Sequence, residues 1–235
     1  MNGHTHFATL HNGETIPRAK IPERSFADFR REIVEAVAAG QRIAALFGDA
    51  PVAANNVELY AVLADSSDAT LRVATTRLEA GSFQSLTPDC PQAHLFEREI
   101  AEQYGVHPDG HPWFKPVRFH ASYRTGHDAW GRKPGEVPVI GVTDYYRVEG
   151  DEIHEVAVGP VHAGVIEPGH FRFQCHGEQV FHLEISLGYQ HRGAERTLVG
   201  GPDKRTIHTL ETVAGDTSIG HGTAYCQVIE ALSGC

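Results

Sequence analysis

The feature that most constrains the fold of this chain is a long central stretch with little hydrophobic periodicity. From Gly110 to Gly150 the sequence is rich in Gly, Pro, His and aromatic residues. That composition is typical of an extended connector rather than of a packed core, so two units are expected, one on either side of it. Its aromatic residues are too many for a free linker and are expected to lie along a neighbouring surface; they are Trp113, Phe114, Trp130, Tyr145 and Tyr146.

The residues before the connector begin with an arm and an amphipathic helix. Residues 1–24 are polar and are predicted to be irregular. Ser25 and Asp28 then have the spacing of a capping box, and a helix is expected to follow and to end near Gly40. Its apolar stripe consists of Phe26, Phe29, Ile33 and Val37.

Two alternating runs and a second helix complete this N-terminal unit. Apolar side chains alternate along residues 57–64 and 71–75, and residues 65–68 between these runs are typical of a turn. An antiparallel hairpin is therefore expected. A second helix is predicted from about Gln92 to Tyr104, and Gly105 is expected to close it.

Beyond the connector the pattern predicts a β-hairpin followed by helices. Residues 171–175 and 180–185 alternate around a turn at 176–178. Helices are expected at about 190–199 and 220–232, the second with an apolar stripe at i, i+3, i+4 and i+7. No later residue in the sequence covers that stripe, so we expect that the natural chain continues or that a partner supplies the missing surface; its residues are Tyr225, Val228, Ile229 and Leu232.

These patterns predict an α+β chain with four parts. They are an irregular arm (1–24), an α+β domain (25–120), a connector (121–150) and the β-hairpin and first helices of a mostly α-helical domain (151–235) that is expected to be truncated.

Composition excludes several kinds of site. Thirty acidic against twenty basic residues give a net charge of -10, which argues against a nucleic-acid-binding surface. The four cysteines form no C-x-x-C pair, so neither a zinc ribbon nor a disulfide framework is expected. No stretch approaches the roughly 18 apolar residues of a membrane span. Direct membrane insertion is therefore not expected, and membrane association would come through partner proteins.

Glu97, Arg98 and Glu99 lie together on the second predicted helix. Taken alone, such charges are typical of a solvated helix face. The string F-E-R-E-I-A-E-Q-Y-G-V that contains them, followed by G-H-P at residues 110–112, resembles the C subunit of bacterial complex I. The resemblance covers residues 26–116. It implies a non-catalytic scaffold that joins catalytic subunits, so these three residues are expected to serve an interface rather than a redox step.

Three histidine-containing motifs follow in the second unit. They are G-P-x-H at residues 159–162, E-P-G-H-F at 167–171 and G-Y-x-H-R-G-x-E at 188–195. The first two motifs could bring His162 and His170 to one cavity, and the alternative is two surface or capped histidines in a loop.

The order and spacing of the three motifs resemble the large subunit of formate hydrogenlyase and of related complex-I-like (group 4) nickel-iron hydrogenases. They are also similar, more distantly, to the D subunit of complex I, and the match covers about residues 156–234. The resemblance implies a fusion of a C-type domain to the opening segment of a D-type or large-subunit domain, within a membrane-bound complex-I-like oxidoreductase.

The resemblance also implies roles for the motif residues. In the complex I D subunit the matching loop faces a quinone headgroup, so His162 or His170 is expected to donate a hydrogen bond or a proton to a bound quinone. His191, Arg192 and Glu195 are expected to lie on a helix near a neighbouring iron–sulfur subunit. The alternative for Arg192 is a surface ion pair within that helix.

The metal site of the hydrogenases is not retained. In that family the first ligand pair comes from R-x-C-G-x-C, whose matching positions here are Thr212, Ala214 and Thr217. Nickel-iron sites need soft thiolate ligands, so no nickel-iron centre is expected in this chain. Asp216 and His221 flank the lost position and are candidate polar groups of an altered cavity; the alternative is that Asp216 only caps the helix that contains His221.

Partners and location follow from the same resemblance. A complex-I B-type subunit would hold the iron–sulfur cluster, and membrane-arm subunits would keep this chain on the cytoplasmic, inner face of the cell membrane. The chain itself is expected to bind no cofactor directly, except that a quinone is possible. A non-catalytic structural or assembly subunit is the alternative. A His-based metal hydrolase is disfavoured, because no H-E-x-x-H or comparable spacing occurs.

Metal analysis of the purified full-length protein tests the loss of the nickel-iron site. We expect no stoichiometric nickel, because alanine has no donor atom and a neutral threonine hydroxyl is a poor substitute for thiolate. A nickel-iron hydrogenase measured by the same method is the control, and stoichiometric nickel in this protein would refute the prediction.

Overall fold

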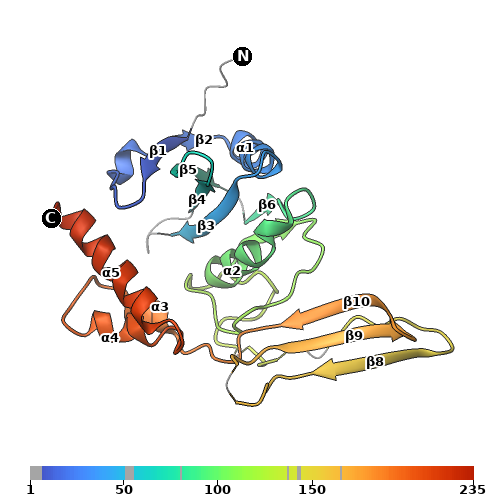
Figure 1. The fold of residues 1–235 in the computed structure, drawn as a ribbon. Coiled ribbons are helices and arrows are strands. Elements are labelled where there is room, and N and C mark those ends of the chain that lie inside the picture. Colours follow the sequence, from blue (N-terminus) through green and yellow to red (C-terminus); the bar gives the residue numbers. More distant parts are fainter. Residues whose placement is uncertain (1–6, 51–55, 80, 137, 142–143, 165) are drawn as a thin grey trace.

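The computed structural model describes residues 7–50, 56–79, 81–136, 138–141, 144–164 and 166–235. The fold is mixed α/β, with a five-stranded, a three-stranded and a two-stranded sheet and few helices (Figure 1). An N-terminal unit, an irregular connector and a second unit follow one another along the chain. Within the described ranges, no helix is both long and apolar enough to cross a lipid bilayer.

The N-terminal unit is built on the five-stranded sheet, in the order β1-β5-β4-β3, with β2 parallel to β5. The predicted hairpin is confirmed, because β4 and β5 pair antiparallel with Asp65 opposite Thr70. Strand β3 was missed, because a register shift between Ile43 and Ala45 interrupts its alternation. The strands are β1 (Ala8–His11), β2 (Glu23–Arg24), β3 (Arg42–Asp49), β4 (Val57–Asp65) and β5 (Thr70–Leu78).

Both predicted helices of this unit are confirmed. Helix α1 (Phe26–Ala38) begins where Ser25 Oγ accepts a hydrogen bond from the Asp28 backbone N–H at 3.1 Å, and it packs against β3, β4 and β5. Helix α2 (His94–Tyr104) packs against β3 and ends at Gly105, whose φ of 66° is left-handed. Short elements complete the unit: η1 (Arg18–Lys20), β6 (Ser82–Gln84), η2 (Pro91–Ala93) and β7 (His107–Asp109).

The expectation of a solvated charged face on α2 is wrong. Glu97 is 0% exposed, Arg98 5% and Glu102 1%. The Glu97 carboxylate accepts hydrogen bonds from the Ser85 hydroxyl, the Leu86 N–H, and the N–H and hydroxyl of Thr87, at 2.6 to 3.2 Å. A buried carboxylate is tolerated when donors replace its lost water in this way.

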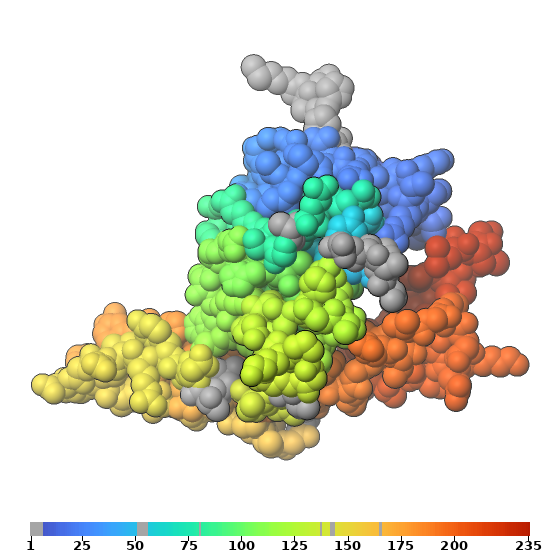
Figure 2. Space-filling model, turned by 180° about the vertical axis from the view of Figure 1, so that it is seen from behind, coloured from blue at the N-terminus to red at the C-terminus, as the bar shows by residue number. Residues whose placement is uncertain are grey.

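The connector contacts α2 through its backbone, and three of its aromatic residues, Trp113, Tyr145 and Tyr146, lie against the second unit, as predicted for a neighbouring surface. Between Gly110 and Glu152 the described residues form neither helix nor strand. Arg98 donates to the carbonyl oxygens of Lys115 and Pro116 at 2.7 and 3.0 Å. The aromatic side chains of the connector stack on other rings: Phe114 stacks on Trp130, and Trp113 stacks on His182 of the second unit. Figure 2 shows the connector, in yellow-green, lying against the N-terminal unit and the second unit.

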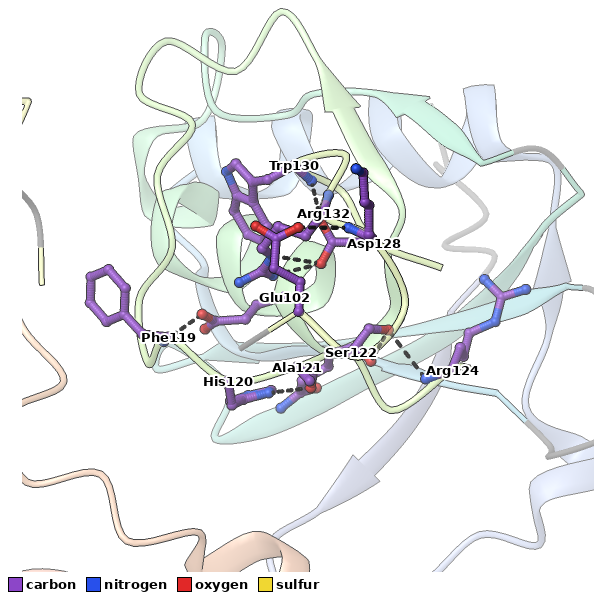
Figure 3. A network of polar contacts seen from close by, with 12 residues as sticks. Glu102, Phe119, His120, Ala121, Ser122, Arg124, Asp128, Trp130 and Arg132 are labelled. Atoms are coloured by element: carbon purple, nitrogen blue, oxygen red, sulfur yellow. Dashed lines mark hydrogen bonds and ion pairs between the residues drawn. The ribbon is translucent and has the colours of Figure 1, made fainter. Parts of the chain in front are cut away.

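Side chains from α2 and from the connector itself form hydrogen bonds with connector backbone groups that no helix or strand pairs (Figure 3). Glu102 accepts hydrogen bonds from the N–H groups of Arg118 and Phe119 at 2.8 and 2.6 Å. Asp128 accepts from the Trp130 N–H and from both the N–H and the guanidinium of Arg132. Polar contacts to the buried Glu102 and the half-buried Asp128 therefore fix the irregular course of the chain.

The second unit opens with a three-stranded antiparallel sheet. Strands β9 (His170–His176) and β10 (Gln179–Ser186) form the predicted hairpin, and β8 (Ile153–Val158) adds a third strand beside β9. The helix expected at 190–199 shrinks to α3 (Ala194–Thr197), because Gly193 adopts a left-handed φ of 70°. Helices α4 (Thr206–Glu211) and α5 (Ser218–Ser233) follow.

The expected C-terminal helix is confirmed as α5, and two of the four residues of its apolar stripe are exposed while Tyr225 and Ile229 are half-buried. Val228 is 54% exposed and Leu232 70%. A space of about 310 Å³ is lined by this part of α5, by the loop after β1 and by Leu71.

The buried carboxylate of Glu97 gives a stability prediction. Glu97→Ala is expected to lower the free energy of unfolding by about 3 kcal/mol or more, because several buried donors lose one charged acceptor. Glu35→Ala, on a side chain that is 67% exposed, is the matched control and should cost under about 0.5 kcal/mol. Urea unfolding followed by circular dichroism measures both; similar losses in the two variants would contradict the assigned role of Glu97.

Candidate functional site

The three histidine motifs of the second unit meet around one open pocket of about 590 Å³. Each motif and the connector contribute to its walls, although the contributing segments lie far apart in the sequence. The lining residues are Val117 and Arg118 from the connector, His162, Ile166, Glu167, Pro168, Gly169 and Phe171 from the first two motifs and the segment between them, and Leu187, Gly188, Tyr189, Gln190 and His191 from the third motif and the residue before it.

His162 reaches this pocket from the loop between β8 and β9. Its Nε2 lies 2.8 Å from the Gly169 carbonyl oxygen, and its ring meets Phe171 edge-on with centroids 5.8 Å apart. A carbonyl oxygen only accepts hydrogen bonds, so Nε2 carries the proton of the neutral ring. Nδ1 is then the nitrogen that can take up a further proton.

A glycine permits the close turn of this loop. Gly159 has a φ of 83°, and a Cβ there would lie 2.2 Å from the Gly169 oxygen and 2.7 Å from His162 Nε2. The peptide bond from Gly159 to Pro160 is cis. The glycine of the G-P-x-H motif therefore permits the contact that orients His162.

His170, the second histidine candidate, lies elsewhere. It begins β9 and is 8% exposed, whereas its neighbour Phe171 lines the pocket. Successive side chains of a strand point to opposite faces, which places His170 away from the pocket. Its ring lies 5.5 Å from that of Tyr145, and its Nδ1 lies 3.3 Å from the Gly159 oxygen.

Asp216 and His221 are not brought to this pocket. Asp216 is exposed in the loop before α5, and His221 lies in the first turns of that helix. Thr217, not Asp216, occupies the N-cap position, and it makes no side-chain cap hydrogen bond. The structure therefore supports neither a shared cavity with His162 nor the alternative capping role of Asp216.

Arg192 connects the third motif to the loop where the hydrogenase family has its first cysteine pair. Its guanidinium donates to the carbonyl oxygens of Thr212 and Val213. The alternative of an ion pair within a helix is wrong, because Arg192 precedes α3 and Glu195 pairs with Arg118 instead.

Two residues expected at an interface, Glu99 and Glu195, meet inside this chain. Arg118 donates to Glu195 at 2.7 Å and to Glu99 through its other terminal nitrogen. Gln103 donates to both carboxylates, at 3.0 and 3.2 Å. The contact joins α2 of the N-terminal unit to α3 of the second unit.

Burial shifts the pKa values of two groups beside the pocket. It raises the pKa of the Glu99 carboxyl, an effect that Arg118 opposes and Glu195 reinforces. Burial also lowers the pKa of His191, helped by the positive charge of Arg118 and by His120. The lowered pKa favours the neutral imidazole of His191, which lines the pocket.

The donor atoms near the altered loop do not fit a nickel-iron centre. Ala214 and Thr217 offer no thiolate, and Cys226 is exposed on α5. Among the residues that the structure describes, no three or more His, Cys, Asp or Glu side chains are grouped closely enough to hold a metal ion.

The N-terminal part of the chain contains a domain of a respiratory-complex family. Residues 16–130 match the family described as "Respiratory-chain NADH dehydrogenase, 30 Kd subunit". The mixed α/β fold of this part, with the five-stranded sheet and two helices, is consistent with that domain.

Known relatives extend the match into the second unit. Formate hydrogenlyase subunit 5 of Escherichia coli is 28% identical over 176 residues, which are 68% of this chain and 30% of that protein. Hydrogenase-4 component G of Escherichia coli is 28% identical over 188 residues, 74% of this chain and 33% of that protein. The C/D subunit of the NADH-quinone oxidoreductase of Methylococcus capsulatus is 24% identical over 169 residues, 62% of this chain and 28% of that protein.

The chain is therefore similar to complex I C-type subunits and to subunits of complex-I-like hydrogenases, which is the resemblance that its motifs indicated. The chain spans about a third of the length of the curated relatives that it matches.

The contact between Gly188 and the connector gives a test of how the pocket is built. Gly188 has a φ of 94°, and a Cβ there would lie 2.2 Å from the Val117 carbonyl oxygen. Gly200 has a similar φ of 108° with nothing within 4 Å of its Cβ position. Gly188→Ala is expected to cost about 1–3 kcal/mol more unfolding free energy than Gly200→Ala, because only the first adds a steric clash. Equal costs in urea unfolding would show that Val117 does not pack on Gly188.

Proposed function

We propose that this chain is an oxidoreductase subunit of a membrane-bound complex-I-like assembly and that its pocket binds a quinone-type ligand. The observation that carries the proposal is the convergence of the three motifs on one pocket with His162 in its wall. The volume of about 590 Å³ lies in the range of small-molecule sites. Apolar side chains suited to a flat, apolar ring line it: Ile166, Pro168, Phe171, Leu187 and Tyr189.

His162 supplies the acid–base chemistry in this proposal. Its Nε2–H is held by Gly169, so the ring offers a proton to a ligand only after Nδ1 has been protonated. Reduction of a quinone to a quinol consumes two electrons and two protons. An iron–sulfur cluster in a partner subunit would provide the electrons. His162 Nδ1–H would provide one proton to a quinone oxygen, and the second proton would come from solvent through the open pocket.

The proposed partners follow from the relatives. An iron–sulfur subunit of the complex-I B type and membrane-arm subunits would hold this chain at the cytoplasmic face of the cell membrane. The support is that the relatives are named as parts of formate hydrogenlyase, hydrogenase-4 and NADH-quinone oxidoreductase.

A non-catalytic assembly role is the second candidate, and a specific surface favours it. One face of the β8-β9-β10 sheet is apolar and open: Val156, Val158, Leu183 and Ile185 are 40 to 45% exposed. Their registered partners, Phe171 and Phe173, lie between them on the same face. Exposed apolar patches of this kind mark surfaces that other proteins cover.

Turnover of the assembled complex separates the two candidates. His162→Ala is expected to lower quinone-linked turnover at least tenfold without loss of assembly, because positioned acid–base groups contribute about 10²-fold or more. His154→Ala, on the exposed strand β8, is the control and should leave turnover unchanged. If both His162→Ala and His170→Ala retain full turnover, the quinone role fails and the assembly role is favoured.

A further inference from the structure

The N-terminal unit positions part of the pocket wall, although the motif resemblance gives it only a scaffold role. Val117 and Arg118 of the connector line the pocket. Glu102 on α2 holds the Arg118 N–H at 2.8 Å, and the Val117 oxygen lies against Gly188. Helix α2 therefore positions one wall of a pocket whose other walls belong to the second unit.

Arg118 is the charged group of that wall, and it bridges two carboxylates. Its guanidinium donates to Glu195 on α3 at 2.7 Å and also to Glu99 on α2. The side chains are 17% exposed for Arg118, 29% for Glu99 and 54% for Glu195, so Glu99 is the more enclosed carboxylate. We call these three residues the Glu99–Arg118–Glu195 cluster.

The charge of this cluster depends on a proton. With both carboxylates ionised it carries a net charge of minus one, and with one carboxyl protonated it is neutral. Burial raises the pKa of Glu99, and the nearby Glu195 and Glu102 raise it further against the effect of Arg118. Other titratable groups face the cluster or line the opposite wall: Glu102, Tyr104, His120, Tyr123, His162, Glu167, Tyr189, His191 and Arg196.

We propose that Arg118 binds the negatively charged form of the pocket's quinone-type ligand and that Glu99 takes up one proton from solvent when this anion binds. The inference rests on the proposed function, because it concerns the ligand of the same pocket. An anion beside Arg118 is repelled by Glu99 and Glu195 while both are ionised. Protonation of a Glu99 oxygen removes one repulsion and leaves the guanidinium to pair with the ligand.

Two quinones of nearly equal size distinguish charge from shape. 2-Hydroxy-3-methyl-1,4-naphthoquinone is an anion near neutral pH, whereas 2,3-dimethyl-1,4-naphthoquinone is neutral. Affinities for the full chain are measured by equilibrium dialysis between pH 6 and 9. In the pH range in which Glu99 is ionised in the free protein, binding of the anion takes up one proton. The affinity for the anion should then fall up to tenfold for each unit by which the pH rises, while the affinity for the neutral quinone stays constant.

Calorimetry in two buffers of different ionisation enthalpy counts the protons directly. The wild-type protein is expected to take up as much as one proton with the anionic quinone and none with the neutral one. Glu99→Gln removes the group that accepts the proton, so the uptake and the pH dependence should both disappear. If Glu99→Gln does not fold, Glu195→Gln removes the second carboxylate and should likewise reduce the uptake.

Variants of Arg118 test the binding partner. Arg118→Met is expected to lower the affinity for the anionic quinone at least tenfold and the affinity for the neutral quinone by less. Arg118→Lys should restore much of the lost affinity, because lysine retains the positive charge. Arg18 is the matched control: it also bridges two carboxylates, Asp49 at 2.8 Å and Glu58 at 2.6 Å, outside the pocket. Arg18→Met should leave both affinities unchanged.

The outcomes separate this inference from the proposed function. If neither quinone binds the wild-type protein, the quinone pocket itself is refuted. If the neutral quinone binds but affinity for the anion does not change with pH, the pocket stands and the proton-coupled role of the cluster is overturned. Proton uptake that persists in Glu99→Gln also overturns the role of Glu99 and assigns the proton to another group.

Discussion

The arrangement of this molecule depends on two buried charged side chains of helix α2 that form hydrogen bonds with the backbone of the irregular connector. The described residues between 110 and 152 do not satisfy their backbone groups through helix or strand hydrogen bonds. Arg98 and Glu102 supply partners instead, the first to carbonyl oxygens and the second to N–H groups. Both side chains are almost completely buried, so water does not compete for these contacts. These hydrogen bonds determine the course of the connector and, through it, the position of the second unit.

The pocket is a consequence of that positioning rather than a property of either unit. Its walls combine the loop that holds His162, the segment that contains His191, and two residues of the connector. Apolar side chains give it the character of a site for a flat organic ligand, while a neutral imidazole and an arginine paired with two acids give it polarity. Such a combination of an apolar lining with a few placed polar groups is common in small-molecule sites.

The sequence predicted those elements whose signals are local, and it failed where distant partners decide. The α1 cap at Ser25 and the turn between β4 and β5 were predicted correctly, because neighbouring residues suffice to form them. Glu97 was expected to face solvent, because its donors at residues 85–87 are not visible from the helix pattern. The sequence could not tell which of His162 and His170 lines the pocket. That depends on which face of strand β9 forms the pocket wall, and only the folded chain defines this face. The shortened helix α3 has a local signal, Gly193, which lies inside the helix expected at 190–199.

The hold of α2 on the connector also determines how such a chain can be recombined. A linker that merely tethers two domains can be cut and rejoined at any point, and its halves can be exchanged between homologues. Here Arg98 and Glu102 contact residues 115–119, so a crossover placed just after Tyr104 would separate the helix from the segment it holds. A chimera that folds should therefore take helix α2 and the coil segment bound to it from the same homologue.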